Sequence, residues 1–187
     1  TESFTITTTV KDIRNVPTGE VIYFDVTVST TEKRIMNLTL LAIVTNKINK
    51  VSTKQKKEKS DNPSEPFTID FFINKNQNFI YGKLLNDHFS VHTNRLLARF
   101  MGLTKPSVHG ICFISFVLAK LVEHLAENDI EKIELFQGRF SKPIFSGETF
   151  SIKGLDSPKK YVHTFSVINN KGETVFSQGV FQLKGPQ

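Results

Sequence analysis

Two ionisable side chains five residues apart, Asp87 and His92, form the part of this sequence best suited to chemistry. A third, His109, follows seventeen residues after His92 and directly precedes Gly110 and a long apolar segment. A carboxylate and an imidazole on one short loop can together activate a water molecule. A glycine at a helix start can offer backbone N–H groups to a polarised carbonyl oxygen. These residue types and this spacing predict a site that adds water to an activated double bond.

A metal site and a reactive thiol are the competing interpretations of nearby residues. His88 and His92 lie four residues apart beside Asp87, which raises the alternative of metal ligation. The segment lacks the helical signature of a zinc site and has no third ligand nearby, so we expect no metal. Cys112 falls in the first turn of the expected long helix, where the helix dipole would lower a thiol pKa. Its apolar neighbours favour a plain core position instead.

Length, charge and cysteine content limit the class of protein. The chain has 187 residues with 17 Phe, a formal net charge of +6 and one cysteine. The phenylalanines predict a real core, and the single cysteine excludes an internal disulfide and fits a reducing, cytoplasmic compartment. No apolar run reaches the ~18 residues of a membrane span, and the first twenty residues contain no visible signal peptide. Much of the positive charge lies between Lys47 and Lys59 with no interleaved aromatic residue, so we expect no nucleic-acid partner.

The chain divides at this basic segment into residues 1–46, a polar linker over 47–65 and a domain over 66–187. The first part alternates polar and apolar residues, which predicts strands over residues 3–7, 21–28 and 34–45. After the linker, a strand begins at Pro66. Two short helices follow, one capped by Asn74 and ending near Leu85, the other covering 94–101 after Thr93 as cap.

The longest helix is expected from about Pro106–Ser107 to Glu127, with Ser107 as its cap. It is apolar on nearly all sides over its first four turns, so other elements must surround it. Four further strands are expected over 133–140, 148–155, 161–168 and 174–183. This order predicts an α+β fold in which an antiparallel sheet wraps around one long helix.

A weak internal similarity links the two ends of the chain. Glu2-Ser3-Phe4-Thr5-Ile6 resembles Glu148-Thr149-Phe150-Ser151-Ile152, and a glycine turn with a second alternating strand follows in each case. Residues 1–46 are therefore either the strand half of a truncated repeat or strands that are similar by composition alone.

Several spaced motifs together resemble the MaoC-like family of (R)-specific enoyl-CoA hydratases and dehydratases, which has the hotdog fold. That family carries Gly-Asp-x-Asn-Pro-aliphatic-His, and this chain has Asp87 and His92 at the same spacing. The family's Gly-x-x-x-Pro and His-Gly segments match 102–106 and His109-Gly110. Residues 139–147, Arg-Phe-Ser-Lys-Pro-Ile-Phe-Ser-Gly, resemble a later family segment. The resemblance covers roughly residues 66–183.

The resemblance implies roles for particular residues. Asp87 matches the acid/base carboxylate, His92 the water-binding imidazole, and Gly110 supplies the N–H that stabilises the thioester oxygen. Phe89, His109, Arg99, Lys105 and Lys142 are the expected substrate contacts, the last three for phosphate groups, although a packed structural position is the alternative for His109. Coenzyme A or an acyl carrier protein would be the substrate handle rather than a cofactor. Exposed sheet edges predict a homodimer or an internal double hotdog.

Three positions depart from the family pattern: Asn86 replaces Gly, Phe89 replaces Asn and Ser90 replaces Pro. We expect the Phe89 ring either to desolvate Asp87 and raise its pKa or to block the water. Ser90 removes the restraint that proline would place on the backbone. The alternatives to a hydratase are therefore a degenerate hotdog domain that only binds acyl thioesters, and a hotdog thioesterase.

Overall fold

The computed structural model describes residues 3–16, 19–45, 66–156 and 161–185, in two compact units that divide between Lys59 and Ser60. The expected basic linker over 47–65 lies outside the described residues. Within them, no helix is long and apolar enough to cross a membrane.

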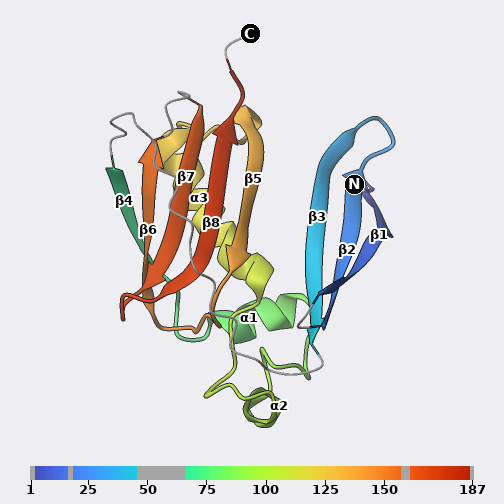
Figure 1. Ribbon diagram of the computed structural model, residues 1–187, viewed down its shortest axis with the longest axis vertical. Coiled ribbons are helices and arrows are strands. Elements are labelled where there is room, and N and C mark those ends of the chain that lie inside the picture. Colours follow the sequence, from blue (N-terminus) through green and yellow to red (C-terminus); the bar gives the residue numbers. More distant parts are fainter. Residues whose placement is uncertain (1–2, 17–18, 46–65, 157–160, 186–187) are drawn as a thin grey trace. The chain divides into compact units, whose positions relative to one another are not determined.

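The first unit is a three-stranded antiparallel sheet in the order β1-β2-β3 (Figure 1). Its strands are β1 (Thr5–Val16), β2 (Gly19–Ser29) and β3 (Arg34–Thr45), which confirms three strands in this part of the sequence. Among the described side chains of this unit only Val21 is buried. The unit therefore contains strands without a core of its own.

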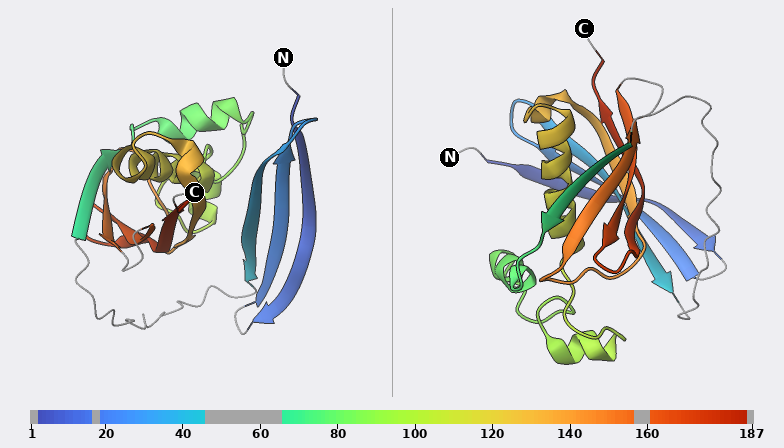
Figure 2. Two further views of the ribbon diagram at one scale, coloured as in Figure 1. Left: turned by 90° about the horizontal axis from the view of Figure 1, so that it is seen from above. Right: turned by 90° about the vertical axis from the view of Figure 1, so that its left-hand side faces the viewer.

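The second unit has a five-stranded antiparallel sheet in the order β4-β6-β7-β8-β5. The strands are β4 (Pro66–Phe72), β5 (Ile133–Phe140), β6 (Thr149–Asp156), β7 (Val162–Asn169) and β8 (Thr174–Leu183). The long helix α3 (Gly110–Leu125) lies along the concave face of this sheet (Figure 2). The predicted sheet around a single long helix is thus confirmed.

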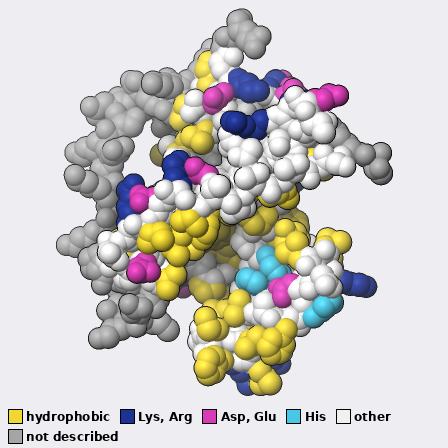
Figure 3. All heavy atoms as spheres, turned by 90° about the vertical axis from the view of Figure 1, so that its right-hand side faces the viewer, with side chains coloured by type: hydrophobic (Ala, Val, Ile, Leu, Met, Phe, Trp, Pro, Cys, Tyr) yellow, Lys and Arg dark blue, Asp and Glu magenta, His cyan; other side chains and the backbone are white. Residues whose placement is uncertain are grey.

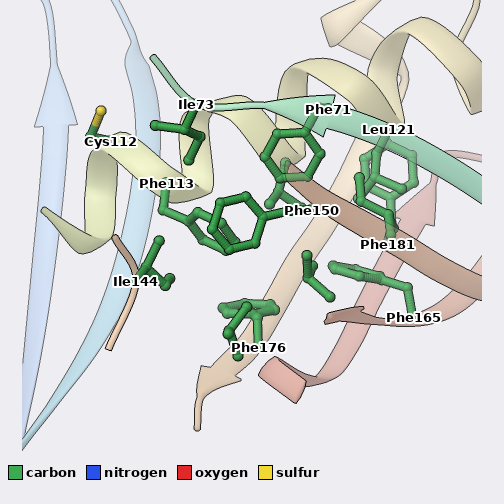
Figure 4. Packing of buried hydrophobic residues seen from close by; sticks show 14 of the residues in the cluster. Phe71, Ile73, Cys112, Phe113, Leu121, Ile144, Phe150, Phe165, Phe176 and Phe181 are labelled. Atoms are coloured by element: carbon green, nitrogen blue, oxygen red, sulfur yellow. The ribbon is translucent and has the colours of Figure 1, made fainter. Parts of the chain in front are cut away.

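Aromatic side chains fill the space between α3 and the sheet (Figure 4). Phe113 and Leu121 project from α3 and are fully buried, as are Phe150 on β6 and Phe181 on β8. The Phe113 and Phe150 rings meet edge to face at 5.2 Å. Full burial of each such side chain contributes about 1.5–3 kcal/mol. The core therefore packs α3 against the sheet and fixes where its first residue lies.

Shorter helices connect β4 to α3: α1 (Gln77–Leu84) and α2 (Arg95–Phe100). A 3-10 turn, η1 (Ile130–Lys132), follows α3. The helices were predicted correctly, but their caps were not. Asn76 rather than Asn74 precedes α1, and Asn94 rather than Thr93 caps α2 by accepting from the N–H groups of Leu96 and Leu97.

The start of α3 also differs from the prediction. The helix begins at Gly110, with His109 as its N-cap residue, and not near Ser107. Val108 is held by a 2.7 Å hydrogen bond from its N–H to the Ile144 carbonyl, so the chain before His109 is extended and tied to a distant loop. Because Val108 bonds to Ile144, the helix begins two residues later, at Gly110. Ser107 is therefore not part of the helix cap and is available for another contact.

Candidate active site

The loop that carries Asp87 leaves α1 through a left-handed residue. Asn86 has φ +56°, a conformation that asparagine adopts more readily than other non-glycine residues. The replacement of glycine by asparagine is therefore compatible with the turn. The N–H of Asp87 then donates to the Gly82 carbonyl at 2.8 Å. Gly82 has to lack a side chain because a Cβ there would come within 2.5 Å of Thr93 Cγ2.

Two donors hold the Asp87 carboxylate. His109 Nε2 lies 2.9 Å and Ser90 Oγ 2.5 Å from the same oxygen, Oδ2. Hydrogen bonds to the Ser90 hydroxyl and then to His109 lower the pKa of Asp87, and they outweigh the opposing effect of burial. The expectation that the Phe89 ring raises this pKa is wrong, because its side chain is 73% exposed.

Ser107 holds the His92 ring at its Nδ1 atom. Its Nδ1 lies 3.1 Å from the Ser107 carbonyl oxygen and 3.1 Å from the Ser107 hydroxyl. A carbonyl oxygen accepts only, so this contact assigns the proton to Nδ1 and leaves a lone pair on Nε2. Burial lowers the pKa of His92 from its usual 6.5, and nearby His109 adds to that decrease. The ring is therefore a neutral acceptor at neutral pH.

His109 joins the two catalytic candidates. Its ring stacks on that of His92 with centroids 4.0 Å apart, and it also contacts the Tyr81 ring at 5.2 Å. It is buried, and its Nδ1 has no hydrogen-bond partner among the described residues. Since the Asp87 carboxylate accepts from Nε2, His109 carries a proton on Nε2. His109 is thus packed and hydrogen-bonded at the helix start.

Gly110 opens α3 directly beside this cluster. As the first helical residue, its N–H has no acceptor within the helix. Gly110 lines a cavity of about 430 Å³ together with Phe140 and Pro143. A Cβ on Gly110 would meet the Phe140 ring at 3.1 Å, so the glycine lets the ring approach the helix start. Gly110 directly follows His109 in the chain, and Ser107, which contacts His92, also lines this cavity.

Three further residues support the cluster, and none of them was predicted from the sequence to have a role in the site. Asn78 on α1 donates from Nδ2 to the His92 carbonyl at 2.7 Å, and its Oδ1 accepts from Ser146 at 2.6 Å. Ser107, expected as a helix cap, contacts His92 instead, and Ser90 contacts Asp87. The position of Ser107 just before His109-Gly110 could have indicated its role in the site. The contacts of Asn78 join segments far apart in the chain, so no local sequence pattern indicates them.

The structure does not bring every expected substrate contact to this cluster. Phe89 is largely exposed, and Arg99 is an exposed residue of α2. Lys105 Nζ lies 3.8 Å from Glu148, and Lys142 Nζ lies 2.6 Å from Glu173. Both lysines are therefore engaged in ion pairs within the chain. Figure 3 shows a face on which histidine and acidic side chains lie together next to hydrophobic ones.

The structure does not support a metal site at His88 and His92 or a reactive thiol at Cys112. Within the described ranges no group of three or more His, Cys, Asp or Glu side chains is arranged to hold a metal ion. His88 Nε2 lies 2.7 Å from Asn86 Oδ1. Cys112 is buried in the core, and burial raises the pKa of its thiol. The core interpretation of Cys112 is confirmed.

Comparison with known proteins agrees with this architecture. Residues 17–175 match the family model described as MaoC like domain. Peroxisomal multifunctional enzyme type 2 of Mus musculus is 26% identical over 108 residues, which cover 58% of this chain and 14% of that protein. The 3-hydroxyacyl-thioester dehydratase Y of Mycobacterium tuberculosis is 33% identical over 84 residues, 44% of this chain and 29% of that protein. The chain thus spans less than a third of the length of either relative.

Solved structures establish the fold. A MaoC-like dehydratase from Phytophthora capsici superposes with a TM-score of 0.83 at 18% identity, over 100% of this chain and 66% of that one. The α+β hotdog fold expected from the sequence is confirmed, with a further three-stranded sheet at the N-terminal end. The extent of the family match leads to one conclusion: this chain belongs to the family of MaoC-like domains.

Proposed function

We propose that this chain catalyses the reversible addition of water to a trans-2-enoyl thioester, giving the (R)-3-hydroxyacyl thioester. The observation that carries the proposal is that His109 contacts both Asp87, through a hydrogen bond, and His92, through ring stacking. His109 directly precedes Gly110, the first residue of α3. Family membership and relatives named as hydratases and dehydratases support the same reaction class.

The geometry suggests a division of roles. The Nε2 lone pair of His92 holds one hydrogen of the reacting water, and the ionised Asp87 accepts the other as a proton. The water oxygen bonds to C3 of the substrate, while the electrons of the C2–C3 double bond move toward the thioester carbonyl. The proton then passes from Asp87 to C2, so that one O–H bond breaks and one C–O and one C–H bond form.

The Gly110 N–H supplies the electrostatic part of the mechanism. Negative charge develops on the thioester oxygen as the hydroxyl adds, and a fixed N–H donor at a helix start stabilises it. Loss of one such donor typically costs about 3 kcal/mol of transition-state stabilisation. The apolar cavity beside Gly110 suits the substrate chain that must approach this donor.

Coenzyme A or the phosphopantetheine of a carrier protein is the proposed handle of the substrate. The net charge of +6 favours approach of either anionic group. Lys105 and Lys142 would have to exchange Glu148 and Glu173 for substrate phosphate before they contribute. Arg99 is the other cation that the sequence places among the candidates.

Hydration of crotonyl-CoA by this chain tests the proposal. Loss of the enoyl absorbance with formation of 3-hydroxybutyryl-CoA is the expected result, and Asp87→Asn should abolish it. Asp70→Asn is the matched control, because Asp70 also accepts a serine hydroxyl at 2.5 Å but lies on β4 in the sheet. Acyl-CoA binding without hydration would instead identify a binding domain, and release of free CoA without hydration would identify a thioesterase.

A further inference from the structure

A single hydroxyl group connects the two catalytic candidates. Ser90 Oγ lies 2.5 Å from Asp87 Oδ2 and 3.0 Å from the backbone nitrogen of His92. The carboxylate can only accept and the amide can only donate, so the hydroxyl donates to Asp87 and accepts from His92. The Ser90 hydroxyl thus acts as a donor and as an acceptor within the site.

The backbone of Ser90 is itself fixed. Its N–H donates to the Thr93 hydroxyl at 3.2 Å, and its carbonyl accepts from the N–H groups of Thr93 and Asn94 at 3.2 and 2.8 Å. Asn94 in turn caps α2. The hydroxyl is therefore presented by a bonded turn at the start of a helix and not by a free loop.

We propose that Ser90 is a positioning residue that locks the Asp87 carboxylate to the backbone of His92 and thereby sets the orientation of both groups toward one water. This inference rests on the proposed function. Both hydrogen bonds described for the Asp87 side chain go to Oδ2, which assigns Oδ1 to the reacting water. Proline, the family residue at this position, has no hydroxyl, so this chain supports its carboxylate in a way that the family pattern does not provide.

The same contact lowers the pKa of Asp87. The Ser90 hydroxyl makes the largest contribution to the lowered pKa of Asp87, ahead of His109. His109 from the start of α3 and His92 from the same loop are the titratable groups that face the carboxylate. Removal of the hydroxyl leaves these two in place, so the pKa should rise toward the usual 3.8 without a change in the neighbouring charges.

Ser90→Ala separates this role from a structural one. We expect the Asp87 carboxyl, followed by ¹³C NMR, to titrate at higher pH than in the unsubstituted chain, and kcat for crotonyl-CoA hydration to fall about tenfold or more with little change in KM. Ser90→Thr keeps the hydroxyl and should remain close to the unsubstituted chain in both measurements. Ser151→Ala removes a hydroxyl that donates to Asp70 at the same 2.5 Å, outside the site, and should leave Asp87 titration and kcat unchanged.

The outcomes distinguish this inference from the proposed function. Unchanged Asp87 titration in Ser90→Ala would overturn the inference even if the chain is a hydratase. An inactive unsubstituted chain would refute the proposed function, while the NMR titration would still decide whether Ser90 holds the carboxylate. If Ser90→Ala does not fold, Ser90→Gly removes the same hydroxyl, and an Asp87 titration identical to that of the unsubstituted chain would equally overturn the inference.

Discussion

The imidazole rings of His92 and His109 are stacked, with centroids 4.0 Å apart and an angle of 30° between their planes. Their hydrogen-bond partners place a proton on different ring nitrogens. His92 directs Nδ1 to the Ser107 carbonyl, whereas His109 directs Nε2 to the Asp87 carboxylate. Burial lowers the pKa of His92, and the nearby His109 lowers it further. His109 therefore links the carboxylate to the imidazole, by a hydrogen bond to Asp87 and by ring stacking on His92.

Replacement of His109 tests this link. His109→Phe keeps an aromatic ring against His92 but removes the N–H that Asp87 accepts. Because a hydrogen bond to a charged group is lost, kcat/KM for crotonyl-CoA should fall roughly 10- to 100-fold. His124→Phe, an exposed position near the other end of α3, is the control and should retain activity. Full activity of His109→Phe would show that Asp87 needs no support from this ring.

The stability of the fold should depend on pH through His92. Its pKa in the folded chain lies below the usual 6.5, so the unfolded chain binds a proton first as the pH falls. The folded state is therefore favoured above about pH 6.5 and loses that advantage as the pH falls below it. Urea unfolding at pH 8 and pH 5 should show a smaller decrease in midpoint for His92→Gln than for the unsubstituted chain. An equal decrease in the urea midpoint for both chains would show that the pKa of His92 is not lowered in the folded state.

Gly110→Ala should impair activity through Phe140. The new Cβ would come within 3.1–3.2 Å of the Phe140 ring, so this ring, which lines the cavity, would have to shift by a few tenths of an ångström. The backbone N–H remains, and alanine is a favourable helix residue, so the fold should persist. We expect kcat/KM to fall about tenfold or more because the substrate is displaced. Gly110→Ala combined with Phe140→Leu should recover part of the loss, and no recovery would contradict this steric explanation.

The core around α3 supplies the stability that holds the site in place. Phe150 is fully buried between α3 and the sheet, so Phe150→Ala should lower the free energy of unfolding by about 3–5 kcal/mol. Phe100 on α2 is 88% exposed, and Phe100→Ala should change it by no more than about 0.5 kcal/mol. Urea unfolding of the two variants measures both changes in the free energy of unfolding. Similar changes would contradict the assignment of Phe150 to the core and of Phe100 to the surface.

The sequence predicted the sheet better than the site because the sheet follows local rules. Alternation and turn residues placed β5 and β8 at their observed ends, and β6 and β7 within one residue. The start of α3 was predicted too early, since the Val108 contact with Ile144 joins segments far apart in the chain. Composition alone does not reveal such contacts.

The same limitation applied within the site. The spacing of Asp87 and His92 singled out both residues, and His-Gly marked the helix start. The bond from His109 to Asp87 joins residues twenty-two positions apart, and the bond from Ser107 to His92 joins residues fifteen apart. The outward direction of the Phe89 side chain depends on the turn that starts at Asn86, which the sequence did not specify.

A double-mutant cycle on crotonyl-CoA hydration tests most directly whether Asp87 and His92 act on one water. Asp87→Asn and His92→Gln should each reduce kcat/KM by about 10²- to 10⁴-fold. If both groups hold the same water, the double variant should be hardly slower than the slower single variant, since either change already removes the activated water. Losses that multiply in the double variant would contradict the account, because the two side chains would then act independently.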